Sequence, residues 1–380
     1  MLKNKNKGIT LIALVITIII LLILAGISIS ALSNQGLFGK AQEAKNKTAK
    51  AQENEMATLD EYAGVLNEYT AGKVTDNINK VLSTTDNTIL KDENENKIVV
   101  PAGFKIVSNA DTNNATTVDK GIVVEDATGT ATNGSQFVWI PVGTIKKANK
   151  STETIELNRY TFAEDGKPTA QNDNVILTYY QELASSNADG TTTYGNVAAK
   201  SITDFKTSVK TNGGYYIGRY EARTATARDA LENALTQITE KGSEYIYNYV
   251  TQIQAAQQCQ DMYTSTKFTS DLMNSYAWDT ATLFLQKCGN STTPYSRQGT
   301  LNTGSLATTG TNSDIQCNVH DMASNVSELT TETSGFQGLI CTQRGGYYGG
   351  NTRTSSRSST YYISYTDIEV GFRPILYVNV

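Results

Sequence analysis

The feature that most constrains this chain is an uncharged, mostly apolar stretch near its start, Gly8 to Leu32. About 20 apolar residues in a helix cross the hydrocarbon core of a bilayer, and a helix satisfies its own backbone there. Lys3, Lys5 and Lys7 precede the stretch, and this basic bias predicts that the short N-terminal end stays cytoplasmic. The sequence therefore predicts a single-pass transmembrane helix over 9–32, with the C-terminal part of the chain extracellular.

The residues at the start of this stretch also indicate how the chain is processed. An ordinary secretory signal has a shorter apolar core that ends in an A-x-A-like site. Here Lys7-Gly8 is followed directly by the apolar run from Ile9, which resembles the leader of a type IV pilin or pseudopilin. The resemblance implies a prepilin leader over 1–8, cleavage by a prepilin peptidase between Gly8 and Ile9, and retention of the apolar helix.

One position departs from the pilin pattern. Pilins usually carry a glutamate five residues into the mature chain, where it pairs with a neighbouring subunit, but position 13 is alanine. A carboxylate in lipid is costly and is kept for a partner, so Ala13 removes one assembly contact. Three interpretations stay open: a low-copy pilin-like protein, a major pilus subunit with pilin partners, and an anchor that is never processed.

The charge balance excludes one class of partner. The chain has 32 basic and 37 acidic residues, and removal of the leader lysines Lys3, Lys5 and Lys7 leaves 29 basic ones. Phosphate binding needs a basic surface, so we expect no nucleic acid partner. The 21 tyrosines are numerous enough to serve either exposed recognition surfaces or strands.

Four cysteines lie in the C-terminal third, at positions 259, 288, 317 and 341. In an exported domain this even number permits two disulfides with three possible pairings. No C-x-x-C spacing is present, which disfavours a zinc site. Cys259 is in phase with the apolar residues of a helical pattern, so we expect a reduced core thiol there. The state of the other three stays open.

A helical segment and a polar one follow the apolar stretch. Residues 40–68 are rich in the strong helix formers Ala, Lys, Glu and Gln, with an apolar residue every three or four positions near the end. We expect a helical stalk over 33–70 that continues the membrane helix, with an interruption near Gly36. A linker over 71–96, which contains a polar turn cluster, is expected next.

Short β-type runs begin at Lys97 and include FVWIPV at 137–142. Helical patterns cover 248–263 and 275–285. Residues 150–211 are hydroxyl-rich with few apolar anchors, and we expect an insertion with little regular structure there.

Three short motifs follow in order in the last seventy residues: HDMASNVSEL at 320–329, RGGY at 344–347 and GFRPI at 371–375. Together with FVWIPV, GGYYIGRYEA and the 248–263 helix, they resemble the formylglycine-generating-enzyme or sulfatase-modifying-factor domain. The resemblance covers roughly 97–380 and implies a variant of the C-type-lectin-like fold. The expected fold class is therefore α+β: a long N-terminal transmembrane and stalk helix, then a C-type-lectin-like domain of short strands with two helices.

Catalysis is not expected. The resemblance implies a catalytic pair of cysteines downstream of the RGG motif, where soft thiolates hold copper. This chain has no cysteine after Cys341, which precedes Arg344. His320 is the only histidine, so a histidine-based triad rests on one residue. A formylglycine-generating type of enzyme is thus the disfavoured alternative.

The segment 347–366 is the expected ligand-binding face. Fourteen of its 20 residues carry a hydroxyl group, and tyrosines with small polar neighbours are typical of recognition surfaces. In C-type-lectin-like proteins this stretch supplies the ligand face. The alternatives are a solvated surface loop and a retroelement-diversified variable segment. The candidate binding residues are Tyr347, Tyr348, Asn351, Arg353, Arg357, Tyr361, Tyr362 and Tyr365.

Asn325 and Glu328 form an N-V-x-E spacing that supplies oxygen ligands of the kind Ca²⁺ takes. Members of the resembling family bind Ca²⁺ nearby, so these two residues are the candidate metal ligands and Ca²⁺ the candidate cofactor. Taken together, the sequence predicts a type IV pilin-like surface protein, single-pass or pilus-associated. Its non-catalytic extracellular domain would bind a glycan or a protein.

Overall fold

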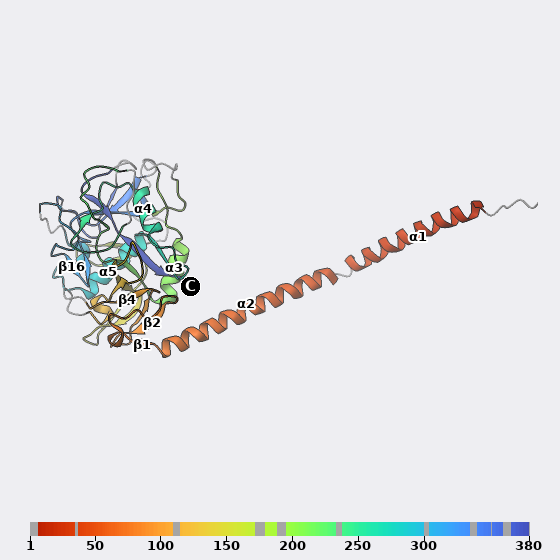
Figure 1. Cartoon of the computed structure of the whole chain (residues 1–380), viewed down its shortest axis with the longest axis horizontal. Helices are drawn as coiled ribbons and strands as arrows, with labels where there is room; N and C mark the ends of the chain where they lie inside the picture. The colour runs from red at the N-terminus through yellow and green to blue at the C-terminus, as the bar shows by residue number, and fades with distance from the viewer. Residues whose placement is uncertain are drawn as a thin grey trace, which may run out of the picture. The chain divides into compact units, whose positions relative to one another are not determined.

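A computed structural model describes residues 7–34, 37–108, 115–171, 179–187, 195–232, 238–299, 304–334, 340–350, 352–359 and 366–379. The chain divides into two compact units, Met1–Thr70 and Ala71–Val380 (Figure 1). Each unit is considered by itself.

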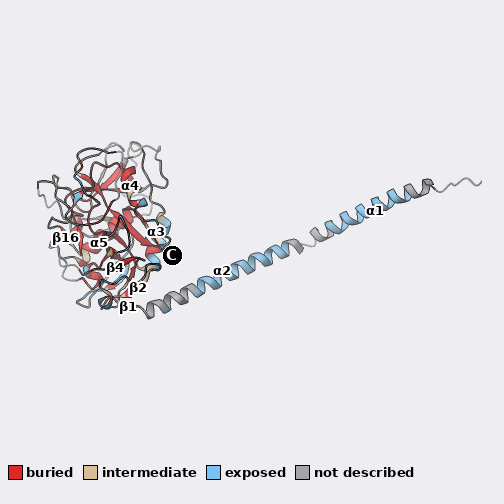
Figure 2. Cartoon of the chain, in the orientation of Figure 1, coloured by how far each residue is buried: buried red, intermediate tan, exposed pale blue. Residues whose placement is uncertain are grey.

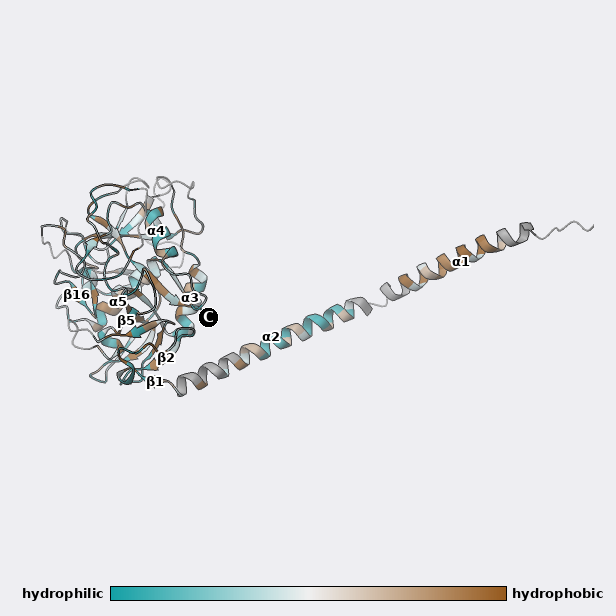
Figure 3. Ribbon diagram, in the orientation of Figure 1, coloured by the Kyte–Doolittle hydropathy of each residue, from teal (hydrophilic) through white to brown (hydrophobic). Residues whose placement is uncertain are grey.

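The first unit contains two helices, α1 (Lys7–Asn34) and α2 (Leu37–Tyr69). Figure 3 shows apolar residues along α1 and mostly polar residues in the middle of α2. One helix ends at Asn34 and a separate helix begins at Leu37, on either side of the interruption expected near Gly36.

The prediction of a transmembrane helix is wrong. The predicted localisation is therefore wrong as well, namely a single-pass membrane or pilus-associated protein with an extracellular C-terminal domain. No helix among the described residues has both the length and the apolar composition needed to cross a bilayer.

The second unit differs from the expected domain with two helices, so the predicted fold class as a whole is corrected. Its described part contains three α-helices and many short strands, and residues 150–211, expected to have little regular structure, contribute four strands and most of one helix. The helices are α3 (Ile202–Asn212), α4 (Gln252–Asp261) and α5 (Ser275–Cys288).

Six antiparallel strands form the larger sheet, in the order β15-β22-β12-β6-β5-β4. Their bounds are β15 (Phe268–Leu272), β22 (Pro374–Val378), β12 (Gly214–Gly218), β6 (Gln136–Pro141), β5 (Val123–Asp126) and β4 (Phe104–Ile106). The central strand β12 is buried at every position, so both faces of the sheet are covered there. Figure 2 shows buried residues (red) on strands inside this unit. Such continuous burial explains why these strands read as apolar runs rather than as alternating patterns.

The tyrosines of β12 show how the two faces are filled. Tyr215 donates its hydroxyl hydrogen to the Ala277 carbonyl of α5 at 2.6 Å, and Tyr216 donates to the Val99 carbonyl at 2.8 Å. Tyr216 also packs edge-on against Trp139, with ring centroids 4.9 Å apart. These tyrosines belong to the core, where each phenol needs a buried acceptor.

The second sheet has the order β11-β18-β19-β20, and β21 pairs with β18 in parallel. Its strands are β11 (Tyr180–Glu182), β18 (Ser327–Ser334), β19 (Ile340–Arg344), β20 (Arg357–Ser359) and β21 (Val370–Phe372). Because Arg344 pairs with Glu328, the connection from β19 to β20 leaves the sheet at the start of β18. Tyr180 pairs with Ser334 at the other end.

Smaller sheets surround these two. A three-stranded sheet, which includes residues expected as a linker, joins β1 (Gly72–Lys73), β2 (Thr88–Lys91) and β3 (Lys97–Val100). The two-stranded pairs are β7 (Gly143–Lys146) with β8 (Thr152–Ile155), β9 (Tyr160–Phe162) with β10 (Pro168–Ala170), β13 (Arg223–Thr224) with β14 (Tyr245–Ile246), and β16 (Ile315–Gln316) with β17 (Val319–His320).

Each of the three described α-helices of the second unit begins at a capping side chain. Ser201 accepts a hydrogen bond from the Asp204 amide of α3, and Asn274 accepts one from Ala277 of α5. Thr251 and Gln254 form a reciprocal capping box on α4. Such caps satisfy amides that have no partner inside the helix, which is why short helices persist in this strand-rich unit.

Candidate ligand-binding surface

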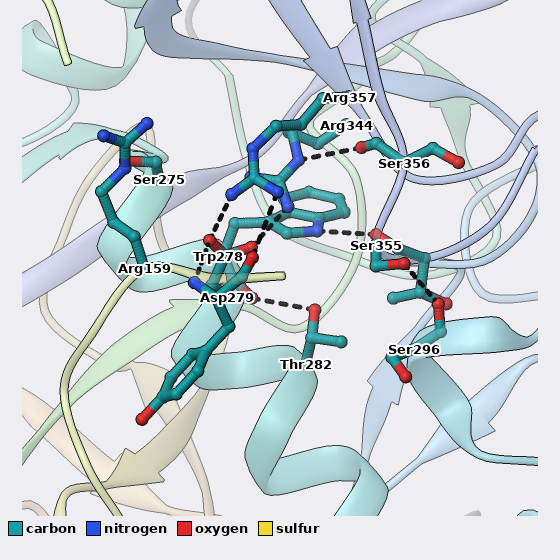
Figure 4. Close-up of polar contacts among 12 residues, drawn as sticks. Arg159, Ser275, Trp278, Asp279, Thr282, Ser296, Arg344, Ser355, Ser356 and Arg357 are labelled. Carbon is teal, nitrogen blue, oxygen red and sulfur yellow. Dashed lines mark hydrogen bonds and ion pairs between the residues drawn. The ribbon is translucent and has the colours of Figure 1, made fainter. Parts of the chain in front are cut away.

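A cluster of five buried ionic side chains lies beneath the predicted binding face. Arg344 donates to Asp279 at 2.5 Å and to Glu332 at 3.2 Å, and Arg159 donates to Glu332 at 2.5 Å. Arg357 donates to both carboxylates. All five side chains are at most 5 % exposed. We call this set the buried ion cluster, and Figure 4 shows its members Arg159, Asp279, Arg344 and Arg357.

The opposite charges in the buried ion cluster stabilise one another's ionised forms. Burial alone would raise the pKa of Glu332, but the guanidinium groups of Arg357, Arg344 and Arg159 lower it to about 2. Three cations and two anions leave one excess positive charge. A buried ion is tolerated only when it is paired and hydrogen-bonded, so this cluster determines a single arrangement of the segments that meet there.

The connection between β19 and β20 is held down by contacts around this cluster. Trp278 donates from Nε1 to the Thr354 carbonyl at 2.9 Å, and Arg344 donates from Nε to the Ser356 carbonyl at 2.9 Å (Figure 4). Ser355 donates its hydroxyl hydrogen to the Ser296 carbonyl at 2.7 Å. The returning half of the connection is thus anchored to α5 and to residues near η4 (Tyr295–Arg297).

Two half-buried tyrosines begin this connection. The Tyr347 and Tyr348 rings meet edge to face, with centroids 6.3 Å apart. The Tyr348 amide donates to the Asn325 carbonyl at 2.9 Å, which ties the pair to the segment before β18. Partial burial, and then the nearby carboxylates of Glu369 and Asp367, raise the pKa of the Tyr348 phenol. The two rings therefore lie close to acidic groups that come from the far side of the connection.

These groups define a surface that we call the tyrosine patch: Tyr249, Tyr347, Tyr348, Asp367 and Glu369. All five residues are half-buried, and the Tyr249 amide donates to the Asp367 carbonyl at 3.1 Å. Partial burial, and then the charge of Asp367, raises the pKa of Glu369. The patch thus combines aromatic faces with two neighbouring carboxyl groups.

Two glycines shape the patch. A Cβ atom on Gly350 would lie 2.2 Å from Cε1 of Tyr347, so the ring lies directly against the glycine backbone. A Cβ atom on Gly349 would lie 3.1 Å from the same ring and 3.3 Å from Oε1 of Glu369. The glycines therefore let Tyr347 lie flat on the connection, with the Glu369 carboxyl group beside it.

The other predicted binding residues have different environments. Arg353 is 40 % exposed and pairs with Glu164 at 3.0 Å, whereas Arg357 points inward as part of the buried ion cluster. Asn351, Tyr361, Tyr362 and Tyr365 lie outside the described residues. Of the predicted binding residues, the structure brings Tyr347 and Tyr348 together and separates Arg357 from the surface.

The candidate metal ligands are buried and engaged with protein groups. Glu328 binds Arg373 at 2.6 Å, and Asn325 donates to Glu221 at 3.3 Å while it accepts from the Ala307 amide at 3.0 Å. In the part of the chain that is described, no group of three or more His, Cys, Asp or Glu side chains is placed to hold a metal ion. Ca²⁺ at Asn325 and Glu328 stays a prediction.

The predicted processing residues Gly8 and Ile9 lie in α1, where the described side chains begin only at residue 13. Sequence reasoning missed Tyr249, Asp367 and Glu369. The two acidic residues directly follow the predicted 347–366 face, but nothing in the local pattern distinguishes them from ordinary surface residues.

Comparisons of the chain with protein-family models, with curated proteins and with solved structures found no match.

Proposed function

We propose that Ala71–Val380 is a non-catalytic ligand-binding module that captures a glycan or a protein through the tyrosine patch. The observation that carries this proposal is the Tyr347–Tyr348 pair, which stays partly exposed on a connection anchored to a buried ion cluster. A rigid aromatic surface loses little conformational entropy when it binds, which favours recognition.

The chemistry of the patch favours ligands that carry hydrogen-bond donors. A sugar can stack an apolar face on a tyrosine ring and donate hydroxyl hydrogens to the carboxyl groups of Asp367 and Glu369. A lysine or arginine side chain of a protein can make the same two kinds of contact. Both ligand classes therefore belong in the test.

The non-catalytic part of the proposal rests on the nucleophiles that are available. Burial raises the pKa of Cys259 well above its usual range and that of Cys288 to about 12, which disfavours reactive thiolates. His320 is 2 % exposed, so it is poorly placed to exchange protons with a bound substrate.

The test is a glycan array and a panel of immobilised proteins, probed with the full chain and with a Tyr347→Ala/Tyr348→Ala double variant. We expect the double variant to lose at least about tenfold in apparent affinity for any ligand that the natural chain binds. The matched control is Tyr179→Ala, because Tyr179 is 50 % exposed and precedes β11 at the opposite end of β18. Equal binding by the double variant and the control would show that the tyrosine patch is not the ligand-binding surface.

A further inference from the structure

A separate cavity of about 810 Å³ lies at the start of α3, between that helix, the end of β11 and the first turn of α5. Its volume is in the range of small-molecule sites. The lining residues that carry polar chemistry include Glu182, Lys200, Ser201, Thr203, Lys206 and Tyr276. None of these residues belongs to the tyrosine patch.

The cavity wall is rich in cations and hydrogen-bond donors. Lys200 is exposed, and the Lys206 ammonium lies 4.1 Å from the centre of the Tyr276 ring, within the range of a cation–π contact. Ile202 and Thr203 form the first turn of α3 and line the cavity. Amides in a first turn have no acceptor within their own helix, and the helix dipole is positive at this end.

The single carboxyl group in the wall is already engaged. Glu182 accepts hydrogen bonds from the Ser275 amide at 2.5 Å and from the Thr331 hydroxyl at 2.7 Å. Burial, and then the charge of Glu332, raises the pKa of Glu182.

More positive charge lies behind the wall. Arg159, fully buried, lies 6.0 Å from the centre of the Tyr276 ring. Among the described residues its Nε and Nη1 have no hydrogen-bond acceptor. Arg159 belongs to the buried ion cluster, which has one excess positive charge. Two cations, Lys206 and Arg159, thus lie near the Tyr276 ring, and this positive charge favours an anion in the cavity.

We propose that this cavity binds an acidic sugar, with its carboxylate between Lys206 and the first turn of α3. The hydroxyl groups of Ser201 and Thr203 supply further hydrogen bonds to the sugar ring, and Glu182 accepts from a sugar hydroxyl. Helix N-termini and lysines together stabilise anions, and the polar wall suits a ligand with many hydroxyl groups. The site is independent of the tyrosine patch, so either assignment can fail alone.

The experiment is calorimetric titration of the full chain with glucuronate, glucose and inorganic phosphate, and with alginate oligomers as a polymeric source of uronate. We expect glucuronate to bind at least about tenfold more tightly than glucose or phosphate, and Lys206→Gln to weaken glucuronate binding about tenfold. Binding of alginate oligomers without binding of free glucuronate would support the acidic-sugar class and assign the source to a polysaccharide.

The matched control is Lys210→Gln, because Lys210 is an exposed lysine one turn later on α3 that does not line this cavity. We expect this variant to bind glucuronate as the natural chain does. Equal affinity of Lys206→Gln and Lys210→Gln would overturn the proposal, provided that both have the thermal midpoint of the natural chain. Phosphate that competes as strongly as glucuronate would also overturn it.

Discussion

Arg344 donates from Nη2 to Asp279 Oδ1 at 2.5 Å, and both side chains are fully excluded from solvent. The bond joins the last residue of β19 to the first turns of α5, and it lies beneath the connection that carries Tyr347 and Tyr348. The candidate binding surface is thus supported by a charge pair whose members are 65 residues apart in the chain.

Removal of the charge on Asp279 tests this support. Asp279→Asn leaves Arg344 and Arg357 facing a neutral amide in a buried site, and the loss of one buried partner costs about 3–5 kcal/mol in the free energy of unfolding. Arg353→Gln is the control, because Arg353 and Glu164 form an exposed pair worth below about 1 kcal/mol. Denaturant unfolding of the full chain measures both, and similar values for the two variants would contradict the inference.

A methyl group at Gly350 is expected to disturb binding more than stability. Gly350→Ala places a Cβ atom 2.2 Å from the Tyr347 ring, so the half-buried ring must turn away. We expect at least about a tenfold loss of affinity for the ligand of the patch, with a change below about 1 kcal/mol in unfolding free energy. Gly349→Ala is the milder control, since its nearest contact is 3.1 Å. Unchanged affinity in Gly350→Ala would show that the position of Tyr347 is unimportant for binding.

His320 predicts a specific dependence of stability on pH. Burial, and then the charges of Arg219 and Arg373, lower its pKa from 6.5 to about 3. Between these values the unfolded chain binds a proton that the folded chain does not, so the free energy of unfolding falls as the pH drops from 6.5 to about 3. Asp271 and Asp314, with pKa values raised to about 6 by burial, act in the opposite direction.

A comparison with His320→Gln isolates the histidine, because the two aspartates are common to both proteins. We expect the loss of unfolding free energy between about pH 7 and pH 4 to be about 3 kcal/mol smaller in the variant. Chemical denaturation at the two pH values measures it. The same loss of unfolding free energy in both proteins would contradict the prediction, because it would mean that His320 binds its proton as readily in the folded chain as in the unfolded chain.

No disulfide joins the four cysteines, and all but the half-buried Cys317 are buried. We expect at most one thiol to react with a thiol reagent at about pH 8 in the folded chain, and all of them to react after denaturation. The thermal midpoint should be the same with and without a reductant. A lower midpoint in reductant would indicate a disulfide instead.

Local patterns in the sequence predicted several elements well. The FVWIPV run forms most of β6. The helix α4 lies within the predicted range 248–263, and α5 begins where the predicted range 275–285 begins and ends three residues beyond it. Local patterns did not predict α3. Only two of its apolar residues, Phe205 and Val209, are fully buried, and its other positions are mostly polar, so the sequence shows no clear apolar period there. The prediction of a membrane helix, made from the apolar run over 9–32, the lysines before it and the leader-like start, was also wrong.

What the sequence by itself determined is therefore the position of short elements and the hydroxyl-rich composition of the 347–366 segment, because periodicity and composition are properties of neighbouring residues. Only the tertiary structure decided which of those side chains are available. Arg357 turns inward because its carboxylate partners, Asp279 and Glu332, are 78 and 25 residues away and are buried with it. The cavity at α3 likewise combines residues of β11, α3 and α5, and the cost of burying charge, rather than any local pattern, determines which groups face it.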